Sequence, residues 1–165
     1  MMTRPQPNLQ LEPLDKLLEW TAIAIAALTF FLALFYYSKL PEIIPIHFNG
    51  SGAADGFGHK SWIWTMPSIA LLSLLLMLWV ARIPHKFNYT IKVTEANAQV
   101  LYRTAARMIR GMNVILMLIF CYLCYTVIGV ARAQITGLNK VIMFGLLLGL
   151  VVLTIGNYIQ MSRIK

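Results

Sequence analysis

The chain has 165 residues, of which 59% are hydrophobic and 12% are charged, and its net charge is +8. A soluble domain carries about a quarter charged residues, and one core of this size cannot bury so much apolar surface, so the composition excludes an ordinary soluble domain and indicates a membrane protein. The basic residues stand at the ends of apolar runs, as they do in membrane proteins, so no nucleic-acid partner is expected.

The N-terminal segment 1–19 is predicted to be extended or disordered because it combines three prolines with polar residues. A single membrane domain is predicted over 20–162, followed by a short tail at 163–165. Four uncharged runs in this domain are each long enough to cross the hydrocarbon core as a helix, at 20–38, 61–81, 111–131 and 141–162. The sequence therefore predicts an all-α integral membrane protein, a bundle of four transmembrane helices within the lipid bilayer.

The distribution of Lys and Arg predicts the orientation of this bundle. The two tails and the segment 82–110 together carry ten of these residues, whereas the segments 39–60 and 132–140 carry four. Because the more basic side stays in the cytoplasm, both termini are predicted to be cytoplasmic and the segment 39–60 extracytoplasmic. The predicted spans contain no Asp, Glu, Lys, Arg or His, which argues against a proton-driven pump.

The segment 39–60 has the composition of a folded loop. Its first half alternates apolar residues and contains two prolines, which predicts an extended, half-buried stretch. Its second half contains four glycines, which allow turns and the close approach of a ligand. Asn49 and Asp55 are of the types that stabilise turns through side-chain to backbone hydrogen bonds. We therefore expect a structured extracytoplasmic loop between helices 1 and 2.

The same loop carries a motif. Leu40-Pro41, Ile44-Pro45, His47-Phe48-Asn49, Gly52 and Asp55 resemble the L-P-x-x-I-P-x-H-F-N-x-x-G-x-x-D signature of the SdpI-like family, domain of unknown function 1648, over roughly residues 20 to 70. The resemblance implies a bacterial cytoplasmic membrane protein and a role in immunity against a secreted antimicrobial peptide. The candidate ligand-binding or loop-structuring residues are Pro41, Pro45, His47, Phe48, Asn49, Gly52, Asp55 and Lys60.

Metal binding is an alternative use of this loop. His47, Asp55 and His59 are of the types that bind zinc, which accepts two histidines and a carboxylate, although their spacing matches no established zinc motif. No residue is assigned a catalytic role, because the sequence carries no catalytic signature that stands by itself. No other cofactor is expected.

The basic segment 82–110 is predicted to end in a helix that begins near Thr94. Arg103, Arg107 and Arg110 follow at i, i+4 and i+7, which places them on one face of that helix. We predict that this face binds anionic lipid headgroups at the inner membrane surface, with a docking face for a cytoplasmic partner as the alternative.

Two further patterns fall inside the predicted spans. Gly145 and Gly149 form a G-x-x-x-G, whose small residues let helices approach closely, either within the bundle or in a homo-oligomer. Cys121 and Cys124 lie in the middle of the third span, where a pair of cysteines is expected to be two buried small hydrophobic residues.

Three hypotheses for function follow. The preferred one is an SdpI-like immunity or binding protein that contacts an envelope-active peptide through the segment 39–60. The alternatives are a metal-dependent membrane enzyme using His47, Asp55 and His59, and an accessory subunit that packs against a membrane transport complex through the fourth span.

Overall fold

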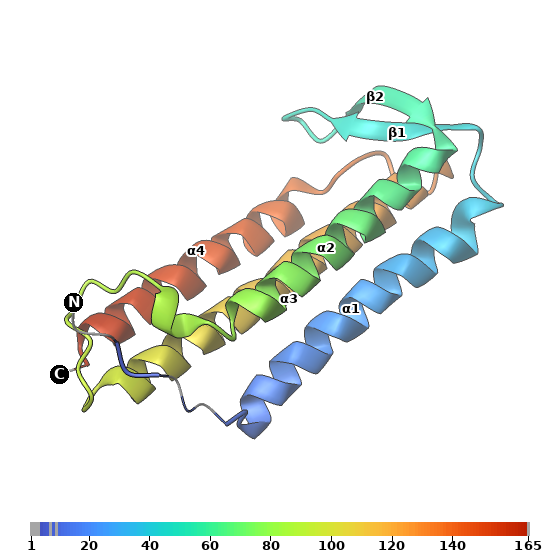
Figure 1. Cartoon of the computed structure of the whole chain (residues 1–165). Helices are drawn as coiled ribbons and strands as arrows, with labels where there is room; N and C mark the ends of the chain where they lie inside the picture. Colours follow the sequence, from blue (N-terminus) through green and yellow to red (C-terminus); the bar gives the residue numbers. More distant parts are fainter. Residues whose placement is uncertain (1–3, 7, 9, 165) are drawn as a thin grey trace.

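The computed structural model describes residues 4–6, 8 and 10–164 of the chain. Helix α1 (Pro13–Tyr37) leads into a hairpin of strands β1 (Ile43–Phe48) and β2 (Ala54–His59). The short 3-10 helix η1 (Lys60–Trp64) then continues into helix α2 (Thr65–Val80). The remaining elements are the 3-10 helix η2 (Pro84–Lys86) and the long helices α3 (Ala98–Ala131) and α4 (Lys140–Ser162), as Figure 1 shows.

The described part of the chain contains four helices that are long and apolar enough to cross a membrane. They correspond to α1, η1 with α2, α3, and α4. This confirms the predicted four-helix membrane bundle with a folded loop between its first two helices. The strand β2 was not expected, since the glycine-rich half of that loop was predicted to form turns.

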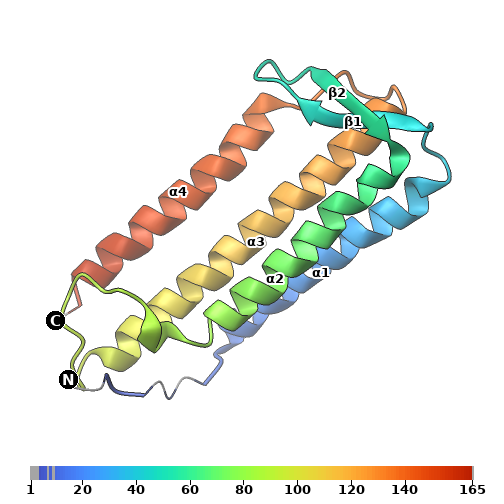
Figure 2. The ribbon, with the colours of Figure 1, turned by 45° about the horizontal axis from the view of Figure 1, so that its top comes forward.

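Helix α3 is the centre of the bundle because α1, α2 and α4 all pack against it. Helices α1 and α3 run in the same direction, from the end that holds both chain termini to the end that holds the hairpin (Figures 1 and 2). We call these the terminal end (residues 4–6, 8, 10–12, 81–97 and 163–164) and the hairpin end (residues 38–64 and 132–139).

Small residues permit the close packing of α1. Ala22 and Ala26 are buried with Ala70, Leu74 and Met117 in a cluster at mid-bundle, and alanines let helix backbones approach closely. Helix α4, by contrast, has no buried residue, and a side chain at Gly145 would meet nothing within 4 Å. A homo-oligomer through Gly145 and Gly149 remains a prediction.

Two helix ends differ from expectation for local reasons. Helix α1 extends seven residues beyond the predicted span because Pro13 suits the first helical position and the Glu12 backbone N–H donates to Asp15. Helix α3 begins at Ala98 instead of Thr94, because the Thr94 and Asn97 side chains each accept a hydrogen bond from the other's backbone N–H.

The N-terminal segment 1–19 was expected to be extended or disordered; residues 13–19 instead form the start of α1, whereas residues 4–6, 8 and 10–12 are in no helix or strand. Arg4 donates to the carbonyl oxygens of His85 and Phe87. The Tyr102 hydroxyl donates to the carbonyl oxygen of Pro5 at 3.1 Å. These bonds hold the segment against the start of α3.

Candidate functional site

The tip of the hairpin is organised around one side chain. Asn49 Oδ1 accepts hydrogen bonds from the Ser51 N–H at 2.9 Å, from the Ser51 hydroxyl at 2.6 Å and from the Ala53 N–H at 3.2 Å. The Gly52 N–H donates to the Asn49 carbonyl oxygen, which closes the turn. The Asn49 side chain thus supplies an acceptor for two backbone N–H groups of the turn.

Below the tip, the two strands pair antiparallel with irregular register around His47. His47 lies opposite Gly56, where a side chain would collide with the His47 Cβ atom, so a residue without one is required. His47 Nδ1 lies 2.5 Å from Asp55 Oδ1 and both side chains are exposed. This exposed pair joins the two strands just below the tip.

A second polar cluster closes the base of the hairpin. Glu42 accepts from Lys60 Nζ at 2.7 Å and from His59 Nε2 at 3.2 Å. His59 Nδ1 in turn accepts from the Ser61 N–H and caps η1. The hydrogen bond from Lys60 holds the pKa of the Glu42 carboxyl below its ordinary value, so this carboxyl carries a negative charge at neutral pH.

Apolar contacts anchor this base to the helices. Leu40, Ile44 and Ile63 are buried in one cluster. The cluster also contains Ala33 of α1 and four residues of α3 that are buried or partly buried. Phe48 and Trp64 pack against the same cluster. Because the base is fixed on both sides, the hairpin lies over the end of the bundle as a cap and not as a free loop.

The hairpin tip also reaches the loop between α3 and α4. The Leu138 N–H donates to the Gly52 carbonyl oxygen at 2.8 Å. Gly52 has a φ of +89°, and a side chain there would collide with the Leu138 carbonyl oxygen. A side chain at Gly137 would collide with the Gly52 carbonyl oxygen in the same way. Two glycines therefore permit the backbones of two distant loops to touch.

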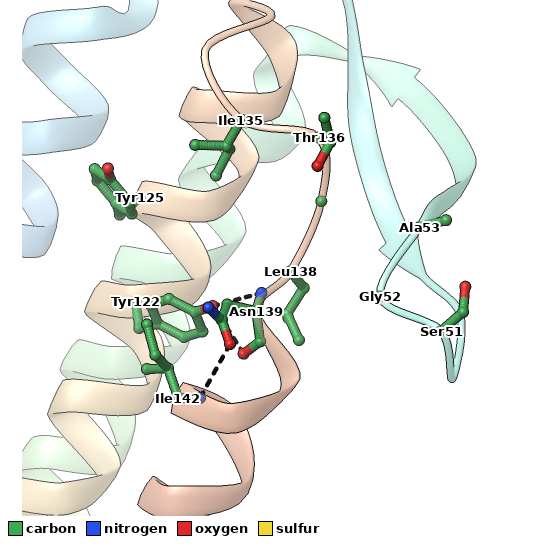
Figure 3. Close-up of a pocket in the computed structure, with 11 residues that line it drawn as sticks. Ser51, Gly52, Ala53, Tyr122, Tyr125, Ile135, Thr136, Leu138, Asn139 and Ile142 are labelled. Carbon is green, nitrogen blue, oxygen red and sulfur yellow. Dashed lines mark hydrogen bonds between the residues drawn. The ribbon is translucent and has the colours of Figure 1, made fainter.

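This contact borders a cavity of about 680 Å³, shown in Figure 3. Tyr122 forms part of its wall. The Tyr122 hydroxyl donates to the Asn139 carbonyl oxygen at 3.1 Å and accepts from the Asn139 N–H at 2.8 Å, which joins α3 to the start of α4. The Asn139 side chain caps α4. The lining consists of Ser51, Gly52, Ala53, Tyr122, Tyr125, Ile135, Thr136, Gly137, Leu138, Asn139 and Ile142.

The lining contains none of Asp, Glu, His, Cys, Lys or Arg. Its polar groups are hydroxyls, an amide and backbone groups, set among apolar side chains. Such a surface suits an uncharged, partly apolar ligand group, because nothing in it supplies an acid, a base or a nucleophile with an activating partner.

Sequence reasoning singled out one side of this cavity. Gly52 borders the cavity and Asn49 shapes the tip, whereas Pro45 lines a separate apolar cavity of about 180 Å³ at the hairpin base, and Pro41 precedes β1. The wall from α3, α4 and their connecting loop was missed. The available signal was Gly137 followed by Asn139, a turn residue and a helix cap in the second loop predicted to face the same way.

The three predicted metal ligands are not brought together. His47 and Asp55 are adjacent near the tip, whereas His59 lies at the base with Glu42, because the strand register places His59 opposite Ile43. Within the described residues, no group of three His, Cys, Asp or Glu side chains is placed to hold a metal ion. The geometry therefore does not assemble the predicted zinc site.

At the terminal end, the three predicted headgroup-binding arginines have protein partners. They face carboxylates of the parallel helix α1 and form an arginine–carboxylate ladder. Its pairs are Arg103 with Glu12, Arg107 with Glu12 and Asp15, and Arg110 with Glu19 at 2.9 Å and Asp15 at 3.9 Å. The guanidinium groups thus join two helices, and headgroup binding by this face stays a prediction.

Comparison with known proteins finds a similarity over the region that contains the hairpin. The model of "Domain of unknown function (DUF1648)" matches residues 24–71, which run from within α1 through the hairpin into α2. An uncharacterized protein of Archaeoglobus fulgidus is 33% identical over 67 residues, which are 41% of this chain and 36% of that relative. No solved structure matches the chain. The chain is therefore similar, over its first helix, hairpin and the start of α2, to a domain whose function is unassigned.

Proposed function

We propose that this protein lies in the bacterial cytoplasmic membrane with its hairpin end outward, and that this end binds an envelope-active peptide in an SdpI-like immunity role. The observation that carries the proposal is the cavity between the hairpin tip and the α3–α4 loop. The orientation rests on the excess of Lys and Arg in the tails and in the segment 82–110.

The lining of the cavity supports binding of a peptide over catalysis. Tyr125 is 54% exposed, and its ring offers apolar surface beside Ile135 and Ile142. Tyrosine contributes large contact area at low conformational cost, which favours recognition of an apolar side chain. Hydroxyl and backbone groups of the lining can meet the main chain of a peptide.

The fixed position of the hairpin supports the same proposal. A binding surface that is already ordered loses less conformational entropy when its ligand arrives. The two polar clusters of the hairpin and the contact between Gly52 and Leu138 provide this order. His47 is therefore a positioning residue in the proposal, because it holds the strands beside the tip without lining the cavity.

Survival under challenge with secreted antimicrobial peptides tests this function. Cells that express the wild-type protein should survive better than cells with an empty vector. The variants Tyr125→Ala and His47→Ala, at equal membrane levels, should lose most of this protection. Tyr158→Ala is the matched control, since Tyr158 is 51% exposed on α4 and lies outside the cavity lining.

The outcomes separate the alternatives. If the Tyr125→Ala protein still protects the cells, the peptide binds elsewhere than at the cavity. A wild-type protein that protects against no peptide of a broad panel would contradict the immunity role itself.

A further inference from the structure

At the hairpin end, Lys and Arg side chains outnumber carboxylates. Its carboxylates are Glu42 and Asp55, and both are bonded to cationic or titratable side chains of the hairpin itself. Lys60 is the partner of Glu42. Lys39 and Arg132, at the ends of α1 and α3, form no ion pair with a described residue. Lys39 and Arg132, together with Lys140 at the start of α4, are therefore available at this end for an anion from outside the protein.

Lys39 and Arg132 meet at the same aromatic residue. Lys39 Nζ lies 5.5 Å from the centre of the Tyr36 ring, and the Arg132 guanidinium lies 4.8 Å from it. Arg132 also donates to Gln134 at 3.2 Å. The ring and the amide hold the cations in position without neutralising them, since an aromatic face attracts a cation but leaves its N–H donors free for an oxyanion.

An apolar strip continues from the cations along α1. Lys39 Nζ lies 3.4 Å from the centre of the Phe35 ring, and Phe35 stacks on Phe31 at 5.7 Å between ring centres. Both phenylalanines are exposed on a helix that is apolar enough to cross a membrane. Phe31 is about one helical turn deeper in the bundle than Phe35. A cation above a strip of exposed rings matches an anionic headgroup above its acyl chain.

The cations at the terminal end have different partners from Lys39 and Arg132. There the arginines of α3 are paired with carboxylates of α1, within the ladder described above. At the hairpin end, the corresponding cations of the same two helices face an aromatic ring and no carboxylate. We propose that Lys39 and Arg132 bind the phosphate of an anionic phospholipid, with an acyl chain lying along Phe35 and Phe31.

The proposal is tested by native mass spectrometry of the purified protein in detergent. The protein is titrated with phosphatidylglycerol and, separately, with phosphatidylcholine. Phosphatidylglycerol should bind more tightly, and its affinity should fall about tenfold in the double variant Lys39→Gln/Arg132→Gln, since each cation near a membrane surface contributes to anionic-lipid binding. Lys39→Arg/Arg132→Lys should keep most of the affinity because it retains both charges.

The matched control removes two exposed cations outside the proposed site, in the double variant Lys86→Gln/Lys140→Gln, and should bind phosphatidylglycerol as the wild type does. Equal loss in this control would mean that net charge alone attracts the lipid and would overturn the site. Glycerol phosphate forms the second arm: displacement of the lipid by glycerol phosphate alone at similar concentrations would identify a free-phosphate site and contradict the lipid. Thermal unfolding of each variant verifies that it is folded, and a double variant that unfolds is replaced by the two single variants.

Discussion

Gly52 shows how one residue determines the shape of the proposed binding surface. It is the glycine of the described chain with a positive φ, and its carbonyl oxygen accepts the hydrogen bond that joins the hairpin to the α3–α4 loop. Any side chain there meets the Leu138 carbonyl oxygen. The requirement for glycine is therefore both conformational and steric.

Replacing Gly52 tests this reasoning. Gly52→Ala should destabilise the hairpin end by about 1–3 kcal/mol, because alanine must adopt a left-handed backbone and displace the second loop. Gly50→Ala is the control, since a side chain at Gly50 meets nothing within 4 Å and its φ is not positive. Hydrogen exchange of the hairpin amides measures the difference. Equal exchange rates in the two variants would show that the contact between Gly52 and Leu138 does not order the tip.

For single residues, the sequence indicated which side chains shape the hairpin better than it indicated which residues they contact. Asn49 could be singled out because asparagine stabilises turns by local hydrogen bonds, and it does so at the tip. Asp55 was expected to do the same, but it lies within β2 and its side chain pairs with His47. The contact between Gly52 and Leu138 could not be predicted in this way, because the partners are far apart in the chain and no local pattern connects them. The separation of His59 from His47 likewise depends on strand register, which the motif alone does not specify.

Among the elements, the pairing of α1 with α3 depends on the arginine–carboxylate ladder and on small residues deeper in the bundle. Asp15 and Glu19 of α1, with Glu12 directly before the helix, line up as the three arginines do on one face of α3. The periodicity of both sets is visible in the sequence. Their pairing requires that α1 and α3 run parallel and adjacent, which only the packing of the bundle establishes.

The ladder should not be uniform in strength. Arg110 and Glu19 side chains are 7% and 13% exposed, so Arg110→Ala leaves a nearly buried carboxylate without its partner and should cost about 3 kcal/mol of stability. Arg103 and Glu12 side chains are 45% and 40% exposed, so Arg103→Ala should cost less than about 1 kcal/mol. Unfolding of the purified variants in detergent, followed by circular dichroism, measures both. A larger loss for Arg103→Ala would contradict this order.

For the whole molecule, the chain divides into two ends with different chemistry. The terminal end uses the N-terminal segment and the ladder to hold α1 against α3. The hairpin end combines a cap, a cavity lined by no Asp, Glu, His, Cys, Lys or Arg, and the cations Lys39 and Arg132 at the Tyr36 ring. The four-helix plan was predictable because charges interrupt the apolar runs. The cap was only partly predictable, since two loops distant in sequence build it together.

Labelling of one cavity residue in intact cells tests the central claim, that an outward cavity at the hairpin end binds the peptide. In a protein that lacks its two cysteines, Ser51→Cys lies in the cavity lining, and Ser38→Cys is an exposed control at the same end. A maleimide that cannot cross the membrane should label both variants from outside. A peptide against which the protein protects should slow labelling of Ser51→Cys alone. Failure of both to label in intact cells would contradict the orientation, and a peptide that leaves Ser51→Cys labelling unchanged would contradict binding at the cavity.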